Sequence, residues 1–219
     1  KKNPKRVVVF DYGVADILKN LGVDAVVGLP KNGKMPEILS NYSDDKYTNV
    51  GSLKETDFEA VESLNPDLII IGGRQAEDIN SFKEIAPTVN LAVDGQDYMN
   101  SFKTVVTDLG NLFDKQDEAK KAIDEIEAKI AKVNKTVTEK GLTASVVMAN
   151  EGSISTFSAK SRYGLIYNGL GFAEVDKNID DSTHGQQVSF EYFLENKSDY
   201  VFVVDRGAVT GKGEAASKL

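Results

Sequence analysis

The stretch that decides the fold occurs twice in this chain, 132 residues apart. The first copy, residues 58–74, reads FEAVESLNPDLIIIGGR, and the second copy, residues 190–206, reads FEYFLENKSDYVFVVDR. Each copy predicts a short helix, a turn, an apolar strand and then an arginine. Apolar runs bounded by turn residues are typical of strands buried on both faces of a parallel sheet. Because ligands of open α/β sheets bind beyond the carboxyl ends of the strands, the two copies suggest two lobes that share one anion.

Composition narrows the class of protein. The 219 residues are enough for two lobes of about 100 residues each, and 41% of them are hydrophobic. The net charge of −8 argues against a nucleic-acid partner, and no apolar run is long enough for a membrane span. The chain has no cysteine, which excludes disulfides, thiolate zinc sites and thiol catalysis.

Arginine is rare and unevenly placed. Of the 26 basic residues only four are arginine, and Arg74, Arg162 and Arg206 all follow apolar segments in loops that contain glycine. The flat guanidinium donates two parallel hydrogen bonds, which suits carboxylate, phosphate or catecholate oxygens. A single arginine in a loop is often simply exposed. For three in comparable loops, we expect a role in binding an anionic ligand.

The rest of the chain predicts an α/β fold with two lobes of mainly parallel sheet joined by one long helix. The first thirty residues read as strand, helix and strand, which favours a parallel sheet. Residues 115–140 form a polar segment with a narrow apolar stripe, as in a helix that joins two bodies. The predicted domains are therefore an N-terminal lobe 1–114, the connecting helix 115–140 and a C-terminal lobe 141–219. We expect the C-terminal lobe to be incomplete, because it has less sheet and helix than such a lobe normally needs.

Enzyme signatures are sparse. The chain has no G-x-x-x-x-G-K-[ST] phosphate loop, no G-x-G-x-x-G after the first strand and no G-x-S-x-G elbow. No residue is therefore predicted to be catalytic, although the possibility of an α/β enzyme of an unrecognised type stays open.

A coiled-coil dimer through the long helix is not favoured, because the apolar stripe of this helix covers too few heptads. We expect a monomer.

Three further residues have two readings each. His184 is the single histidine and lies in a polar loop; it is either a solvent-exposed side chain or a ligand for ferric iron with an open position. Glu59 and Glu191 occupy the same place in the two copies. Each either complements a helix dipole, worth about 0.3–1 kcal/mol, or docks on a two-fold symmetric partner.

Taken in order, these segments resemble the helical-backbone (class III) substrate-binding proteins of ABC importers, in the iron-siderophore and cobalamin branch. The resemblance covers the whole chain. It is carried by residues 6–11 with 21–22, by residues 64–70, by the joining helix 115–140, and by residues 161–164 with 170–172.

Within this family the chain most resembles the lipoproteins that bind catecholate siderophores of the petrobactin type. The resemblance implies a non-enzymatic receptor that captures a ferric siderophore between its lobes and delivers it to the membrane permease. The arginines matching Arg74, Arg162 and Arg206 surround the iron-catecholate centre. His184 reaches the metal only if the siderophore leaves iron sites open, and Glu59 and Glu191 match the permease-docking positions. Cobalamin or haem is the alternative ligand of the same fold.

The resemblance also implies a location and a charge balance. Such proteins are extracytoplasmic, either lipid-anchored to the outer face of the cell membrane in Gram-positive bacteria or periplasmic, so an anchoring cysteine would lie upstream of Lys1. No cofactor is expected beyond the bound Fe3+ complex. Ferric iron prefers oxygen donors, and a ferric tris-catecholate of about −3 needs nearby cations when it is partly buried.

Overall fold

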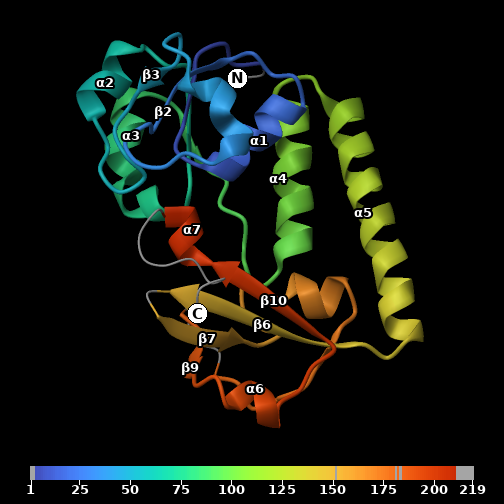
Figure 1. Cartoon of the computed structure of the whole chain (residues 1–219). Coiled ribbons are helices and arrows are strands. Elements are labelled where there is room, and N and C mark those ends of the chain that lie inside the picture. The colour runs from blue at the N-terminus through green and yellow to red at the C-terminus, as the bar shows by residue number, and fades with distance from the viewer. Residues whose placement is uncertain (1–2, 151, 181, 183, 211–219) are drawn as a thin grey trace. The chain divides into compact units, whose positions relative to one another are not determined.

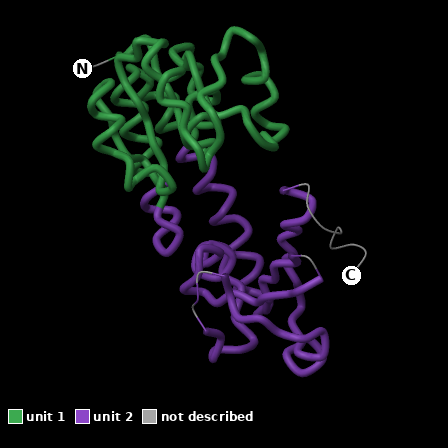
Figure 2. The backbone as a smooth tube through the Cα atoms, turned by 90° about the vertical axis from the view of Figure 1, so that its left-hand side faces the viewer, with its two compact units in different colours: residues 1–93, 103–122 green, residues 94–102, 123–219 purple. Residues whose placement is uncertain are grey.

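The computed structural model describes residues 3–150, 152–180, 182 and 184–210. The chain divides into two compact units (Figure 2): unit 1 comprises residues 1–93 and 103–122, and unit 2 comprises residues 94–102 and 123–219. Helices α4 (Tyr98–Leu112) and α5 (Gln116–Glu139) contribute to both units. The long helix predicted for residues 115–140 is therefore confirmed, as α5. In the described part of the chain, no helix is both long and apolar enough to cross a bilayer.

Unit 1 is built on a parallel sheet. Five strands of the described residues pair in the order β3-β2-β1-β4-β5, and every pairing is parallel. The strands are β1 (Val7–Val9), β2 (Val26–Leu29), β3 (Thr48–Asn49), β4 (Leu68–Ile71) and β5 (Thr88–Asn90). The strand order reverses between β1 and β4, so their carboxyl ends form the topological switch point at which such sheets bind ligands.

Helices cover both faces of this sheet (Figure 1). They are α1 (Tyr12–Asn20), the 3-10 helix η1 (Glu37–Ser43), α2 (Phe58–Ser63), the 3-10 helix η2 (Gly73–Asp78) and α3 (Ile79–Ile85). Val8 of β1 and Ile69 of β4 pack with Val61 of α2 and Phe82 of α3 in one buried cluster. Helix α1 begins after β1 at Asp11, whose carboxylate accepts a hydrogen bond from the Val14 N–H at 3.0 Å, the usual N-cap contact.

Unit 2 contains a mixed sheet. Strands β8 and β10 pair parallel with β6, whereas β7 is antiparallel to β6 and β9 is antiparallel to β7. The strands are β6 (Thr143–Asn150), β7 (Ser153–Phe157), β8 (Ala173–Glu174), β9 (Gln186–Val188) and β10 (Tyr200–Asp205). The remaining elements are the π-helix η3 (Leu165–Gly169), α6 (Tyr192–Glu195) and α7 (Arg206–Thr210).

The two copies of the duplicated stretch form equivalent elements with different burial. Strands β4 and β10 each pair parallel with the first strand of their own unit, β1 and β6. All four residues of β4 are buried, but in β10 Tyr200, Val201 and Val203 are 50%, 51% and 54% exposed. The prediction of a strand buried on both faces is therefore right for β4 and wrong for β10. Val201 and Val203 lie on one face of β10 and stay half-exposed, whereas Phe202 on the opposite face packs against Phe172.

Candidate functional site

Unit 1 has a polar pocket at the carboxyl ends of β1 and β4. Its volume is about 220 Å³, and it is lined by residues 10–13, residues 72–75 and Leu53. The first segment leads from β1 into α1, and the second leads from β4 into η2. The pocket thus lies at the switch point of the sheet, where the fold itself brings Arg74 next to the start of α1.

Arg74 and Gln75 contribute different chemistry to this pocket. Arg74 is exposed, and its guanidinium makes no hydrogen bond or ion pair with another described residue. Gln75 is only 4% exposed; its Nε2 donates a hydrogen bond to the Leu53 carbonyl at 2.8 Å, while its Oε1 has no partner among the described residues. Sequence reasoning singled out Arg74 and missed Gln75, because nothing in a Gly-Gly-Arg-Gln loop indicates which side chain turns inward.

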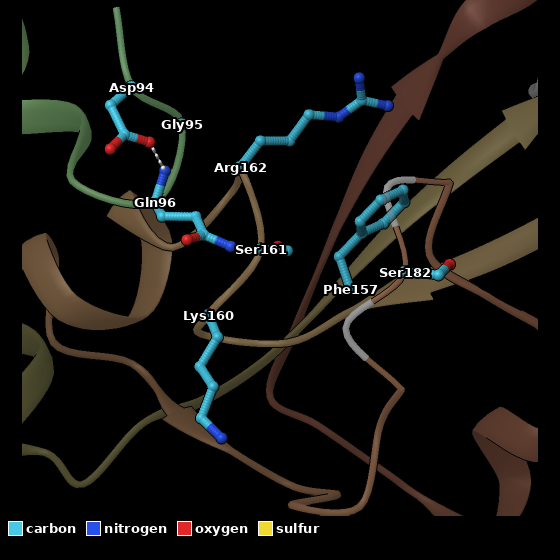
Figure 3. Close-up of a pocket in the computed structure, with 8 residues that line it drawn as sticks. All are labelled: Asp94, Gly95, Gln96, Phe157, Lys160, Ser161, Arg162 and Ser182. Carbon is cyan, nitrogen blue, oxygen red and sulfur yellow. Dashed lines mark hydrogen bonds between the residues drawn. The ribbon is translucent and has the colours of Figure 1, made fainter.

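A second pocket lies within unit 2, around Arg162. It has a volume of about 210 Å³ and is lined by residues 94–96, Phe157, residues 160–162 and Ser182 (Figure 3). The side chains of Lys160 and Arg162 extend from their loop in opposite directions in this view. Arg162 is exposed and has no hydrogen bond or ion pair with a described residue.

Two aromatic rings hold the Arg162 guanidinium. Its Cζ atom lies 5.6 Å from the ring centroid of Phe157 and 5.3 Å from that of Tyr163, and the two rings meet edge to face at 4.8 Å. Cation–π contacts of this kind favour one orientation of the side chain. The guanidinium is therefore held against two rings while its N–H donors stay available.

The hydroxyl of Tyr167 fixes the strand end that carries Phe157. It accepts a hydrogen bond from the Val146 N–H and donates one to the Phe157 carbonyl, each at 3.1 Å. Val146 and Phe157 are opposite residues of β6 and β7, so the hydroxyl is inserted into the ladder where β7 ends. Burial raises the pKa of Tyr167 to about 12, so the hydroxyl keeps its proton. Tyr167 belongs to η3, and π-helical turns often occur at functional sites.

Two glycines allow close packing around this pocket. A Cβ atom on Gly95 would lie 2.9 Å from the Cβ of Arg162, and one on Gly185 would lie 2.8 Å from the Phe157 ring. Gly185 also has a φ of +74°, which other residues rarely adopt. Side chains at either position would displace the residues that form the pocket.

Arg206 and His184 also belong to unit 2. Arg206 directly follows β10, and its Nη1 donates a hydrogen bond to the Asn150 side-chain oxygen at 3.0 Å, at the end of β6. His184 is exposed in a turn closed by a hydrogen bond from the Gly185 N–H to the Ser182 carbonyl at 3.0 Å. Ser182 lines the Arg162 pocket, but His184 is not among its lining residues. Within the described residues, no group of three His, Asp or Glu side chains could hold a metal ion by itself.

The two glutamates of the duplicated stretch are both exposed at the start of a short helix. Glu59 lies in the first turn of α2, and Glu191 is the residue before α6. Hydrogen bonds from its own backbone N–H and from Ser189 lower the pKa of Glu191, so this side chain is charged near neutral pH. The structure thus keeps both carboxylates accessible, one on each unit.

The comparisons with known proteins agree with this architecture. The chain belongs to the family of periplasmic binding proteins, whose sequence model matches residues 7–217. The predicted resemblance to substrate-binding proteins of ABC importers is thereby confirmed.

Individual relatives indicate the kind of ligand more specifically than the family does. The petrobactin-binding protein YclQ of Bacillus subtilis (strain 168) is 49% identical over 219 residues, which is all of this chain and 69% of that protein. Its crystal structure matches with a TM-score of 0.93 over 99% of this chain and 76% of the solved one. The periplasmic catecholate-siderophore binding protein VctP of Vibrio cholerae matches with a TM-score of 0.92 and 33% identity, over 100% of this chain and 78% of its own.

Proposed function

We propose that this protein is an extracytoplasmic receptor that captures a ferric siderophore of the catecholate, petrobactin-like type and delivers it to the permease of an ABC importer. The observation that carries the proposal is the pair of pockets around Arg74 and Arg162, each with a guanidinium that has no anionic partner among the described residues. Relatives at 49% and 33% identity are named for petrobactin and catecholate siderophores.

The chemistry of the pockets suits this ligand. A ferric catecholate presents several negatively charged oxygens, and the siderophore itself satisfies the metal. Guanidinium groups neutralise such oxygens through short charge-assisted hydrogen bonds without competing for the iron. Arg206 adds a third guanidinium group at the carboxyl end of β10, where a hydrogen bond to the Asn150 side chain orients it.

The proposed protein is a carrier rather than an enzyme. It needs no cofactor, because the Fe3+ complex is its cargo. In this proposal, Glu59 and Glu191 bind the permease, and His184 contacts iron only when the siderophore leaves coordination sites open. The description of the family as periplasmic binding proteins supports a location outside the cytoplasm.

A titration tests the proposal directly. The chain has eight tyrosines and no tryptophan, so quenching of tyrosine fluorescence reports ligand binding. We expect a ferric bis-catecholate to bind at sub-micromolar concentration, and iron-free chelator, ferric hydroxamate, haem and cobalamin to bind far more weakly. Preferential binding of haem or cobalamin would replace the proposed ligand class.

A further inference from the structure

The chain leaves the sheet of unit 2 directly after Phe157. Along β6, Val146 pairs with Phe157 of β7, whereas Ala144 pairs with Glu174 of β8. Ala144 also pairs with Tyr200 of β10, so β7 and β8 share the other edge of β6, and β8 takes over where β7 ends. A backbone N–H that leaves a sheet loses its partner in the ladder and needs a new one.

Glu174 supplies the new partner. Its Oε1 accepts a hydrogen bond from the Ala159 N–H at 2.6 Å, two residues beyond the end of β7. The Ala159 carbonyl accepts one from the Asn168 side-chain nitrogen of η3 at 2.8 Å. A Cβ atom on Gly164 would collide with this carbonyl oxygen, so the close approach needs a glycine. Both backbone polar groups of Ala159 are thus bound by side chains from other segments of unit 2.

A tight turn joins Ala159 to Arg162. The Ser158 carbonyl accepts hydrogen bonds from the Ser161 N–H at 3.1 Å and from the Ser161 hydroxyl at 2.7 Å. The Ser161 hydroxyl oxygen accepts one from the Tyr163 N–H at 3.2 Å. Figure 3 shows Ser161 and Arg162 on this loop. Because these contacts leave the turn little freedom, a shift of Ala159 would be transmitted to Arg162.

The position of Arg162 depends on the course of the loop. Its guanidinium lies against Phe157, which precedes the turn, and against Tyr163, which follows it. The two rings also contact each other, so the three side chains meet only while the residues between them keep their course. If the loop leaves this arrangement part of the time, the apparent affinity for an anion falls with the fraction of molecules that keep it.

We propose that Glu174 is a positioning residue for ligand binding, which keeps the Arg162 guanidinium against Phe157 and Tyr163 by holding Ala159. Glu174 is not among the residues that line the Arg162 pocket, so it acts through the loop and does not touch the ligand. Its second carboxylate oxygen makes no hydrogen bond or ion pair within the described residues, so the loop requires an acceptor and not a charge. This inference rests on the proposed function, in which Arg162 binds the ferric catecholate.

Three variants separate the hydrogen bond from other effects. Glu174→Gln keeps an oxygen that can accept from the Ala159 N–H, whereas Glu174→Met keeps the length of the side chain and has no such acceptor. Asn168→Ala removes the hydrogen bond to the Ala159 carbonyl and reaches the same loop from the other side. Each variant is made in the wild type and in Arg162→Ala, and thermal unfolding monitored by circular dichroism shows whether it is folded.

We expect Glu174→Met to bind a ferric bis-catecholate about tenfold more weakly than the wild type, the effect of one lost hydrogen bond. Glu174→Gln should bind like the wild type, and Asn168→Ala should show a smaller loss, since its contact is exposed. In the Arg162→Ala background, Glu174→Met should cause no further loss. A wild-type affinity of Glu174→Met, an equal loss in Glu174→Gln, or a loss that persists without Arg162 would each overturn the inference.

A measurement without ligand separates this inference from the proposed function. The ring currents of Phe157 and Tyr163 shift the NMR signal of the Arg162 side-chain N–H. In Glu174→Met, but not in Glu174→Gln, this signal should move toward that of an exposed arginine, and the Ala159 amide proton should exchange faster. If neither changes, the positioning role is rejected. If both change but the wild type binds no ferric catecholate, the proposed function fails while the contact of Glu174 with the loop stands.

Discussion

Asp67 and Asp199 hold the start of a neighbouring strand in the same way, although they lie 132 residues apart. The Asp67 carboxylate accepts hydrogen bonds from the backbone N–H groups of Lys5 and Arg6 at 2.8–3.1 Å, before β1. The Asp199 carboxylate accepts them from the N–H of Thr143 at 2.8 Å and from its hydroxyl at 2.9 Å, at the start of β6. The duplicated stretch therefore closes the parallel pair of each unit with the same contact.

The Asp199 contact should make stability depend on pH. Hydrogen bonds from the backbone and hydroxyl of Thr143 lower the pKa of Asp199 in the folded protein. The contribution of Asp199 to the free energy of unfolding is therefore fully present above the unfolded pKa of about 3.9. It is lost as the pH falls through the lower pKa of the folded protein. We expect Asp199→Asn to reduce the urea midpoint at pH 7, and the difference from wild type to shrink below about pH 4. Asp45→Asn, which removes a charge from an exposed position, is the control. A difference that stays constant down to pH 2 would contradict this role.

The aromatic contacts of Arg162 predict that lysine cannot replace it. Arg162→Lys keeps the charge but loses the flat fork and the contact with Phe157 and Tyr163. We expect affinity for ferric catecholate to fall about tenfold, and further in Arg162→Ala. Lys177→Ala removes one positive charge from an exposed loop of unit 2 outside the pocket and should have little effect. If Arg162→Lys binds like wild type, then charge alone is sufficient at this position.

The inserted hydroxyl of Tyr167 predicts a coupled loss of stability and affinity. Tyr167→Phe leaves the Val146 N–H and the Phe157 carbonyl without their shared partner, which should cost about 1–3 kcal/mol. Movement of Phe157 should also weaken ferric catecholate binding, and the effect should vanish in an Arg162→Ala background. The control is Tyr42→Phe, since the Tyr42 hydroxyl is also buried but bonds to Ala15 in unit 1. Equal affinity of Tyr167→Phe and wild type would show that Tyr167 acts only on stability.

The exposed glutamates predict a separation of uptake from binding. Reversing both charges, with Glu59→Lys and Glu191→Lys, should abolish siderophore uptake by cells while leaving affinity in solution unchanged. Glu62→Lys with Glu195→Lys makes the same change of charge at exposed positions of α2 and α6 and should be tolerated. Normal uptake by the first pair would reject the docking role.

Much of the fold could be predicted because it follows from local patterns. Apolar runs with flanking turns predicted β1, β4 and β10, and the polar segment with its stripe predicted α5. The exposure of β10 could not be predicted, because it depends on which elements pack against each face of the strand. The same limit applies to the site. Arg74 and Arg162 could be located from their loops, whereas the roles of Gln75 and Tyr167 arise from contacts with Leu53 and β6 that no spacing reveals.

Each copy of the duplicated stretch places a stabilising contact at one end of its strand and an arginine at the other end. In each copy, an aspartate at the amino end anchors the neighbouring strand, and seven residues later an arginine stands at the carboxyl end. Mutations at the arginine end, where we propose that the cargo binds, leave the aspartate contact unchanged. We therefore expect the ligand preference to change without loss of the contact that stabilises the parallel pair of strands. Loop grafting between relatives should accordingly begin after the last residue of β4 or β10 and spare everything before it.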